Sequence, residues 1–114
     1  MKAVISSLLF ALGILPISVF AGDQSGPVMD IRVGSLVSTG HVSHVFINGT
    51  FNGPPNACAR GPWWAFDTDT STGKVMLAVL LTAKATGKNV ILWGLGTCAL
   101  RPDMETIVQV SIQP

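Results

Sequence analysis

Residues 67–98, DTDTSTGKVMLAVLLTAKATGKNVILWGLGTC, constrain the fold more than any other stretch, because they hold the only strong helix signal and one of two cysteines. The run Asp69-Thr70-Ser71 supplies side chains that can accept hydrogen bonds from the free N–H groups of a first helical turn. Gly87 is the expected left-handed residue after the last turn, and Lys84 lies near the negative end of the helix dipole. The sequence predicts a helix over residues 72–86.

Apolar residues occupy almost the whole circumference of this predicted helix. At about 100° per residue, one side carries the expected core residues Met76, Val79, Leu80 and Ala83. The other side carries Leu77, Ala78, Leu81 and Ala85, beside Lys74 and Lys88. Two explanations stay open for this second apolar side: loops of the domain wrap it, or it is buried between subunits. The second explanation predicts a homo-oligomer with an interface that includes Lys74, Leu77, Ala78 and Leu81.

Residues 1–21 have the features of a secretory signal peptide. Lys2 precedes an apolar run over residues 8–15, and Val19 and Ala21 suit a small-residue cleavage site. An uncleaved membrane anchor is the alternative, but Pro16 and several serines shorten the apolar run to the length of a signal-peptide core. The sequence therefore predicts an exported protein, periplasmic or secreted, with no stable membrane anchor and a single domain over residues 22–114.

Cys58 and Cys98 are the only cysteines of the chain. Export to an oxidising compartment favours a structural disulfide in a small domain, because such a domain can bury only a limited core. Two cysteines cannot complete a zinc site, and neither belongs to a C-x-x-C motif. We therefore predict a Cys58–Cys98 disulfide.

Charge is balanced in the predicted exported domain. Of the seven basic side chains only Lys2 lies within residues 1–21, so six remain against six acidic side chains. A nearly neutral domain exerts no net electrostatic attraction on nucleic acid or on an anionic membrane surface. The sequence thus predicts no nucleic-acid partner.

The remaining segments have the signals of β-strands. Apolar and polar residues alternate from Val28 onward, and Pro54 and Pro55 stop any central strand in an irregular loop over residues 49–62. Five strands are predicted, over residues 28–37, 41–48, 63–67, 89–93 and 105–112. The first two form a hairpin around a turn at residues 38–40. With the helix after the third strand, the order β-β-β-α-β-β predicts a mainly β fold with one helix, a five-stranded Greek-key barrel of the OB type.

Parts of the sequence resemble two groups of known proteins. The segment WWAFDTDTSTGKVMLAVLLTAKATGKNV, followed by GLGTC and a last strand that begins with Glu, resembles a family of small exported, mostly uncharacterised bacterial proteins. The signal peptide, the element order, the cysteine pair and the helix exit ATGKNV resemble more distantly the B subunits of subtilase-cytotoxin-like and pertussis-like toxins. The second resemblance implies a glycan-binding OB-fold pentamer, and no individual binding residue is carried over from it.

No residue set in the sequence has the spacing that catalysis or metal binding requires. His41 and His44 are three residues apart, which places them on opposite faces of a strand rather than together as metal ligands. Asp67 ends a strand and Asp69 suits a helix N-cap better than an acid–base pair. Neither a G-x-S-x-G elbow nor a glycine loop that opens a helix is present. We therefore predict a protein that is not an enzyme and that uses no metal and no cofactor.

The candidate ligand-binding residues are aromatic and basic: Arg60, Trp63, Trp64, Arg101 and His41. Adjacent strand residues face opposite ways, so one tryptophan should lie in the core and the other should offer an exposed ring to a sugar or a partner surface. Which one is exposed stays open, as does burial of both under the loop 49–62. An OB barrel would bind its ligand on the side that bears the second and third strands, or at loops 38–41 and 94–103.

Two functions from different classes are compatible with these observations. The first is a secreted or periplasmic binding module without enzymatic activity, which recognises a glycan or a protein surface. The alternative is a periplasmic structural or inhibitory protein without a small-molecule ligand.

Overall fold

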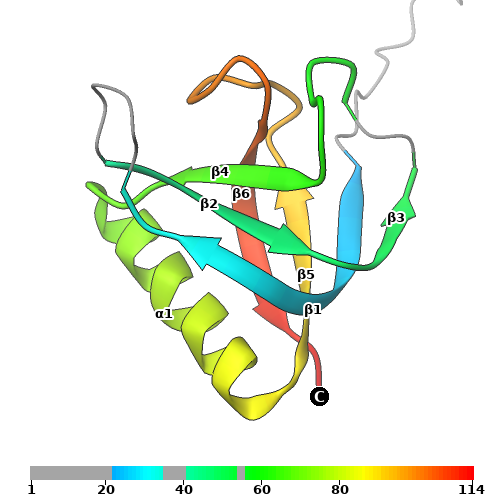
Figure 1. Ribbon diagram of the computed structural model, residues 1–114, viewed down its shortest axis with the longest axis vertical. Coiled ribbons are helices and arrows are strands. Elements are labelled where there is room, and N and C mark those ends of the chain that lie inside the picture. Colours follow the sequence, from blue (N-terminus) through cyan, green and yellow to red (C-terminus); the bar gives the residue numbers. More distant parts are fainter. Residues whose placement is uncertain (1–21, 35–40, 54–55) are drawn as a thin grey trace, which may run out of the picture.

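The computed structural model describes residues 22–34, 41–53 and 56–114, which form a β-barrel with one helix (Figure 1). The predicted signal peptide and the predicted turn at residues 38–40 lie outside the described residues. In chain order the elements are β1 (Asp23–Arg32), β2 (Val42–Ile47), β3 (Thr50–Asn52), β4 (Trp63–Asp67), α1 (Ser71–Thr86), β5 (Asn89–Gly94) and β6 (Glu105–Ile112). Each of the five predicted strands has a counterpart among them, and β3 is additional.

The strands close into a ring of hydrogen bonds in the order β1–β2–β4–β6–β5–β1. The β4–β6 pair is parallel, whereas the other pairs in the ring are antiparallel. A closed ring with the helix between β4 and β5 confirms the mainly β fold of the OB type. The predicted count of five strands was one too few, because β3 forms inside the stretch 49–62 that we expected to be irregular.

β3 continues β2 along the same edge of β1. Ile47 of β2 pairs with Val28, and Thr50 of β3 pairs with Ser25, in one continuous antiparallel register. Gly49 lies between the two strands, where a Cβ atom would be 1.6 Å from the carbonyl oxygen of Ser25. The glycine therefore lets the strand bend over β1 without a steric clash.

β1 begins at Asp23 rather than at the predicted Val28. Its first half pairs with β5 and β3, and its second half pairs with β2. A proline and several polar residues hide the first half from the hydrophobic pattern. A bulge between Val28 and Asp30 shifts the inward face, so Val28 and Ile31 pack in the core while Met29 is exposed.

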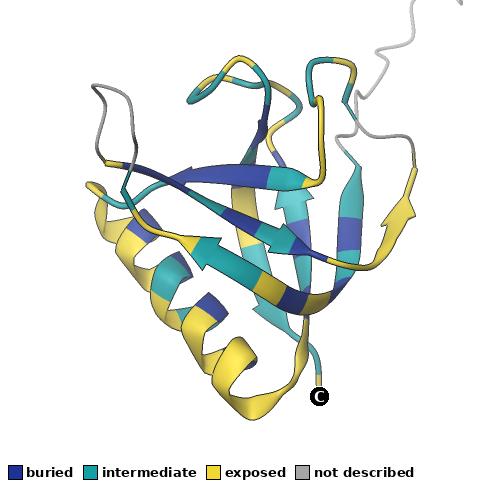
Figure 2. Cartoon of the chain, in the orientation of Figure 1, coloured by how far each residue is buried: buried dark blue, intermediate teal, exposed yellow. Residues whose placement is uncertain are grey.

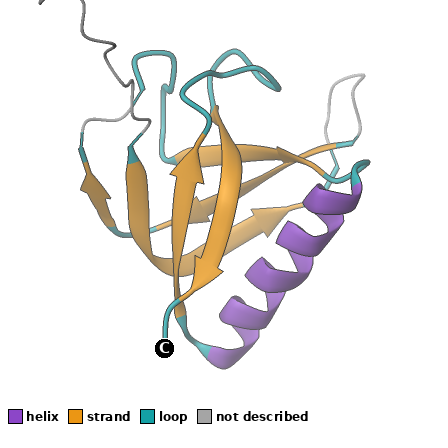
Figure 3. Ribbon diagram, turned by 180° about the vertical axis from the view of Figure 1, so that it is seen from behind, coloured by secondary structure: helices purple, strands orange, loops and turns teal. Residues whose placement is uncertain are grey.

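The helix α1 has the predicted caps. Thr70 Oγ1 accepts a hydrogen bond of 2.9 Å from the backbone N–H of Gly73, and Gly87 adopts the left-handed conformation with φ of 69°. The helix packs against β1, β4, β5 and β6, and covers one end of the barrel (Figure 3). Leu77, which we placed on the side away from the core, is half-buried and packs against it. The apolar side of α1 that faces away from the core is therefore narrower than predicted.

Two apolar clusters lie on opposite sides of β4, and the middle of this strand is accordingly buried on both faces (Figure 2). Val42, Ala65 and Met104 form a small cluster outside the barrel, with Trp63 and Leu100 packed against it. The main core inside the barrel contains Val28, Val45, Ile47, Trp64, Phe66, Met76, Leu80, Ala83, Val90, Leu92 and Ile107.

Cys58 and Cys98 form a disulfide, which confirms the predicted pair. The bond joins the loop before β4 to the loop before β6, and thus holds together two segments that are 40 residues apart in sequence. Within the described ranges, no helix is both long enough and apolar enough to cross a membrane.

Candidate ligand-binding site

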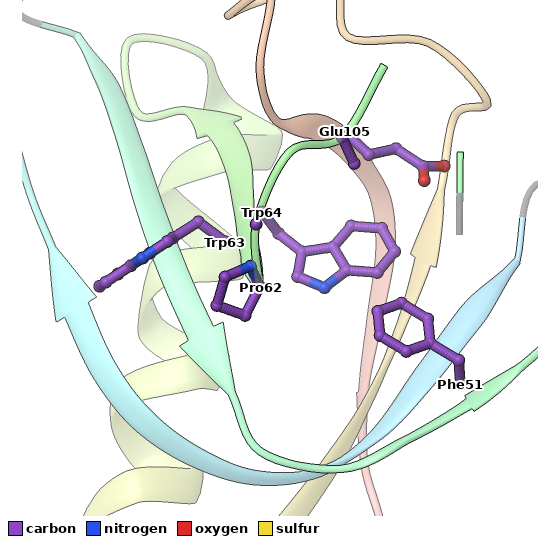
Figure 4. Close-up of a pocket in the computed structure, with 7 residues that line it drawn as sticks. Phe51, Pro62, Trp63, Trp64 and Glu105 are labelled. Atoms are coloured by element: carbon purple, nitrogen blue, oxygen red, sulfur yellow. The ribbon is translucent and has the colours of Figure 1, made fainter. Parts of the chain in front are cut away.

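The two adjacent tryptophans at the start of β4 point to opposite sides of the strand (Figure 4). Trp64 lies inside the barrel and is 3% exposed, whereas Trp63 is half-buried on the outer side. The structure therefore decides the point that the sequence left open: Trp63 is the more accessible indole. Burial of both rings under the loop 49–62 does not occur.

Trp64 is held in place by a polar network inside the barrel. Its Nε1 donates a hydrogen bond of 2.8 Å to Oε1 of the buried Gln24. Nε2 of Gln24 in turn donates to the carbonyl oxygens of Ile47 and Gly49, both at 3.2 Å. Because the indole N–H of Trp64 and the amide of Gln24 are both paired, the Trp64 ring is held in one position inside the barrel and is not a mobile ligand contact.

Trp63 belongs to a group of side chains that we call the Trp63 face, made of Arg32, His44, Phe46 and Trp63. The guanidinium carbon of Arg32 lies 4.6 Å from the centre of the Trp63 ring, a cation–π distance. The ring of His44 meets Trp63 edge-on at 5.4 Å between centroids, and the ring of Phe46 is tilted at 5.7 Å. Strand register brings the group together, since Phe46 pairs with Trp63 and His44 pairs with Arg32.

Charged groups of both signs surround the Trp63 face. Asp30 Oδ2 accepts a hydrogen bond of 3.1 Å from Arg32 Nε, and Arg101 Nε lies 3.3 Å from Asp103 Oδ1. Burial lowers the pKa of His44 from its ordinary value, and the positive charges of Arg101 and Arg32 lower it further. The imidazole is therefore neutral at neutral pH, so the face presents hydrogen-bond donors and acceptors around an aromatic ring.

On the other side of the start of β4 lies a pocket of about 330 Å³, which we call the Phe51 pocket (Figure 4). The rings of Phe51 and Trp64 are stacked, with their centroids 6.4 Å apart and their planes at 21°. The surface of the pocket is almost entirely apolar. Its lining residues are Phe51, Ala59, Gly61, Pro62, Trp63, Trp64 and Glu105.

Among the described residues that line the Phe51 pocket, Glu105 is the one with an ionisable side chain, and it is 3% exposed. Its Oε2 accepts a hydrogen bond of 3.1 Å from the backbone N–H of Gly96. Burial raises the pKa of the Glu105 carboxyl above its ordinary value of 4.5, and the hydrogen bond from Gly96 partly opposes this. Gly94 makes room for the carboxylate, because a Cβ atom there would lie 1.8 Å from Glu105 Oε2.

The structure brings together some of the predicted ligand-binding residues but not all. Trp63 and Trp64 line the Phe51 pocket, and the exposed Arg60 lies between two lining residues in the chain. Arg101 lies on the outer side of the barrel, where its charge acts on His44. His41 is at the far end of β4, with Nδ1 3.1 Å from Asp67 Oδ1, and so is separate from the tryptophans.

Sequence reasoning missed Arg32, Phe46, Phe51 and Glu105 as members of these sites. Arg32 and Phe46 lie on strands that we predicted, but only the strand register shows that they flank Trp63. Phe51 lies between two Asn-Gly pairs, a position that suggested turns rather than a strand. Within residues 22–34, 41–53 and 56–114, no group of three or more His, Cys, Asp or Glu side chains is arranged to hold a metal ion.

Comparison of the chain with protein-family models, with curated proteins and with solved structures finds no match.

Proposed function

We propose that this protein is a binding module without enzymatic activity, and that it holds a carbohydrate against the Trp63 face. The observation that carries the proposal is the half-buried Trp63 indole beside the Arg32 guanidinium, on the barrel side formed by β2 and β4. OB barrels bind oligosaccharides and oligonucleotides on this side. The balanced charge of residues 22–114 favours the oligosaccharide.

The chemistry of the Trp63 face suits a sugar ring. A pyranose has an apolar C–H face that packs on an indole, and hydroxyl groups at its edge that need hydrogen-bond partners. Arg32 supplies donors with a side chain that is 62% exposed, and Asp30 supplies acceptors with a side chain that is 44% exposed. The exposed positions of these charged groups let them turn toward a ligand without the loss of a buried interaction.

The experiment is a glycan array probed with the purified protein, with its disulfide intact, and repeated with three variants. Trp63→Ala removes the proposed stacking surface, and Arg32→Ala removes the proposed donors. Lys88→Ala is the matched control, because it also removes one exposed positive charge but lies between α1 and β5. Urea unfolding of each variant separates loss of binding from loss of the fold.

We expect binding to fall by about tenfold or more in Trp63→Ala and by a smaller factor in Arg32→Ala, since tenfold corresponds to about 1.4 kcal/mol. Lys88→Ala should bind like the wild type. A wild-type protein that binds no glycan above background would overturn the proposal. The structural or inhibitory role without a small-molecule ligand would then be the better interpretation.

We also propose that the module acts outside the cytoplasm, as the signal-peptide pattern of residues 1–21 predicts. The disulfide supports this proposal, because such bonds persist mainly in oxidising compartments. Mass spectrometry of periplasmic or secreted material should find a chain that begins at Gly22 with Cys58 and Cys98 oxidised. Retention of residues 1–21, or two free thiols, would contradict it.

A further inference from the structure

One edge of β3 has no partner strand within the described part of the chain. β3 pairs with β1 through Thr50, Phe51 and Asn52, and its opposite edge makes no ladder with another described strand. All three residues are exposed and none is charged or proline, so neither a charge nor a proline protects this edge. The unpaired N–H and C=O groups of such an edge can accept a further strand.

The Phe51 pocket lies beside this edge for a topological reason. β2 pairs with β1 on one edge and with β4 on the other, and β3 continues β2 in the same register. β4 begins only at Trp63, which pairs with Phe46, so the β4 side of β3 receives no strand. The pocket between Phe51 and the segment Ala59–Pro62 is therefore located where a strand continuing the line of β4 would run.

The lining and the volume of the Phe51 pocket determine which kind of side chain can bind in it. Its walls are the stacked rings of Phe51 and Trp64 together with Pro62, and its surface is almost entirely apolar. At about 330 Å³ it is near the lower limit of small-molecule sites, which suits one aromatic or branched aliphatic side chain. A charged group would lose its hydration there, beside a Glu105 carboxyl that is itself buried.

We propose that an extended segment of a partner protein adds to the free edge of β3 and places one uncharged aromatic or branched aliphatic side chain in the Phe51 pocket. The main chain of the partner would supply hydrogen bonds to the edge, and the pocket would supply specificity for the side chain. The pocket shares Trp63 with the Trp63 face, but its other lining residues, among them Phe51, Pro62 and Trp64, do not belong to that face (Figure 4). The proposal does not depend on glycan binding.

The test uses a capped pentapeptide, Ser-Thr-Phe-Thr-Ser, titrated into the isotope-labelled protein with its disulfide intact. We expect the NMR amide signals of Thr50, Phe51 and Asn52, and the indole signal of Trp64, to shift with one common affinity. A peptide with Ser in place of Phe should bind at least tenfold more weakly. Equal binding of the two peptides would overturn the proposal.

Two N-methylated peptides test the edge separately from the pocket. Adjacent amides of a strand point to opposite sides, so methylation of one alternate set blocks the bonds to β3 and methylation of the other set does not. We expect one methylated peptide to lose at least tenfold in affinity and the other to bind within about threefold of the parent. Equal affinity of the two methylated peptides would show that the edge is not used.

A protein variant tests the pocket without removing a wall. Gly61 lines the pocket, and a Cβ atom added to it would meet no atom within 4 Å, so Gly61→Leu adds an apolar side chain at the pocket without a clash of its Cβ. It should weaken peptide binding at least tenfold, whereas Val108→Leu, at a 50% exposed position of β6, should not change it. Unchanged binding by Gly61→Leu would overturn the proposal. The proposal would also be overturned if the NMR signals of β3 shifted when the protein was diluted without peptide. A second copy of this chain would then be bound at the edge of β3.

Discussion

Trp64 Nε1 donates a hydrogen bond of 2.8 Å to Gln24 Oε1 inside the barrel, and this bond joins the start of β4 to β1. Gln24 is 3% exposed and also donates to the carbonyl oxygens of Ile47 and Gly49. One polar side chain thus pairs with three groups on two segments of the chain, β4 and residues 47–49. It fixes the ring that separates the main core from the Phe51 pocket.

Replacing Gln24 should therefore be costly. Gln24→Met keeps the side-chain length but leaves two buried groups, the Trp64 indole N–H and the Ile47 carbonyl oxygen, without the partner that Gln24 provides. We expect a loss of about 2–4 kcal/mol in the free energy of unfolding, since each unsatisfied buried group costs about 1–3 kcal/mol. Urea unfolding measures it, and Gln109→Met at an exposed position of β6 is the control. A loss below that of the control would show that the network does not stabilise the fold.

The Cys58–Cys98 bond should contribute strongly to stability. It joins residues 40 apart, and the loop-entropy model assigns about 4 kcal/mol to a loop of this length. We expect the double variant Cys58→Ser with Cys98→Ser to unfold at a much lower urea concentration than the oxidised wild type. The reduced wild type should resemble the double variant. Coinciding unfolding curves for the oxidised and the reduced protein would contradict this prediction.

The bend between β2 and β3 should tolerate no side chain. Gly49→Ala would place Cβ 1.6 Å from the carbonyl oxygen of Ser25, and backbone atoms cannot move away without breaking the β1–β3 ladder. We expect destabilisation of about 1–3 kcal/mol or more, as in other overpacked sites. Gly61→Ala is the matched control, because its added Cβ would meet no atom within 4 Å. Similar thermal unfolding of both variants would count against the close approach at Gly49.

The contribution of Glu105 to the free energy of unfolding should fall as the pH rises past the ordinary titration range of a glutamate. Burial raises the pKa of Glu105 above 4.5, so the folded protein binds its proton more tightly than the unfolded chain does. The penalty for ionising Glu105 is absent below pH 4.5 and complete above the raised pKa of the folded state. Glu105→Gln should remove this pH dependence and be relatively more stable at neutral pH. Parallel stability–pH curves for wild type and variant would refute the assignment.

Self-association through α1 remains our prediction for the exposed apolar residues of the helix. Leu81 is 50% exposed, and Ala78 and Lys74 are exposed as well. Leu77 packs against the core, so a charge there would destabilise the fold and is unsuitable as a test. Leu81→Lys should convert an oligomer to a monomer in light-scattering measurements, whereas Val33→Lys, at a 63% exposed position outside α1, should not. A wild-type protein that is monomeric at micromolar concentration would contradict the prediction.

The helix and the OB order of the elements were predictable because their sequence signals are local. The disulfide was predictable because one pairing of the cysteines was possible. Capping residues and a terminal glycine mark the bounds of α1, whose observed start differs by one residue from the prediction. The last strand was predicted at its observed bounds, residues 105–112. With only two cysteines, one pairing was available.

The tertiary structure alone decided which tryptophan is accessible and where the candidate sites lie. Alternation along a strand shows that Trp63 and Trp64 face opposite ways, but the direction in which the sheet closes determines which ring is inside. β3 is three residues long, too short for a periodic pattern, and it exists because of its pairing with β1 far away in the sequence. The burial of Glu105 was likewise decided by the tertiary structure. Trp64, Gly94 and Gly96 pack around its side chain, and pairings between such distant segments leave no pattern in the local sequence.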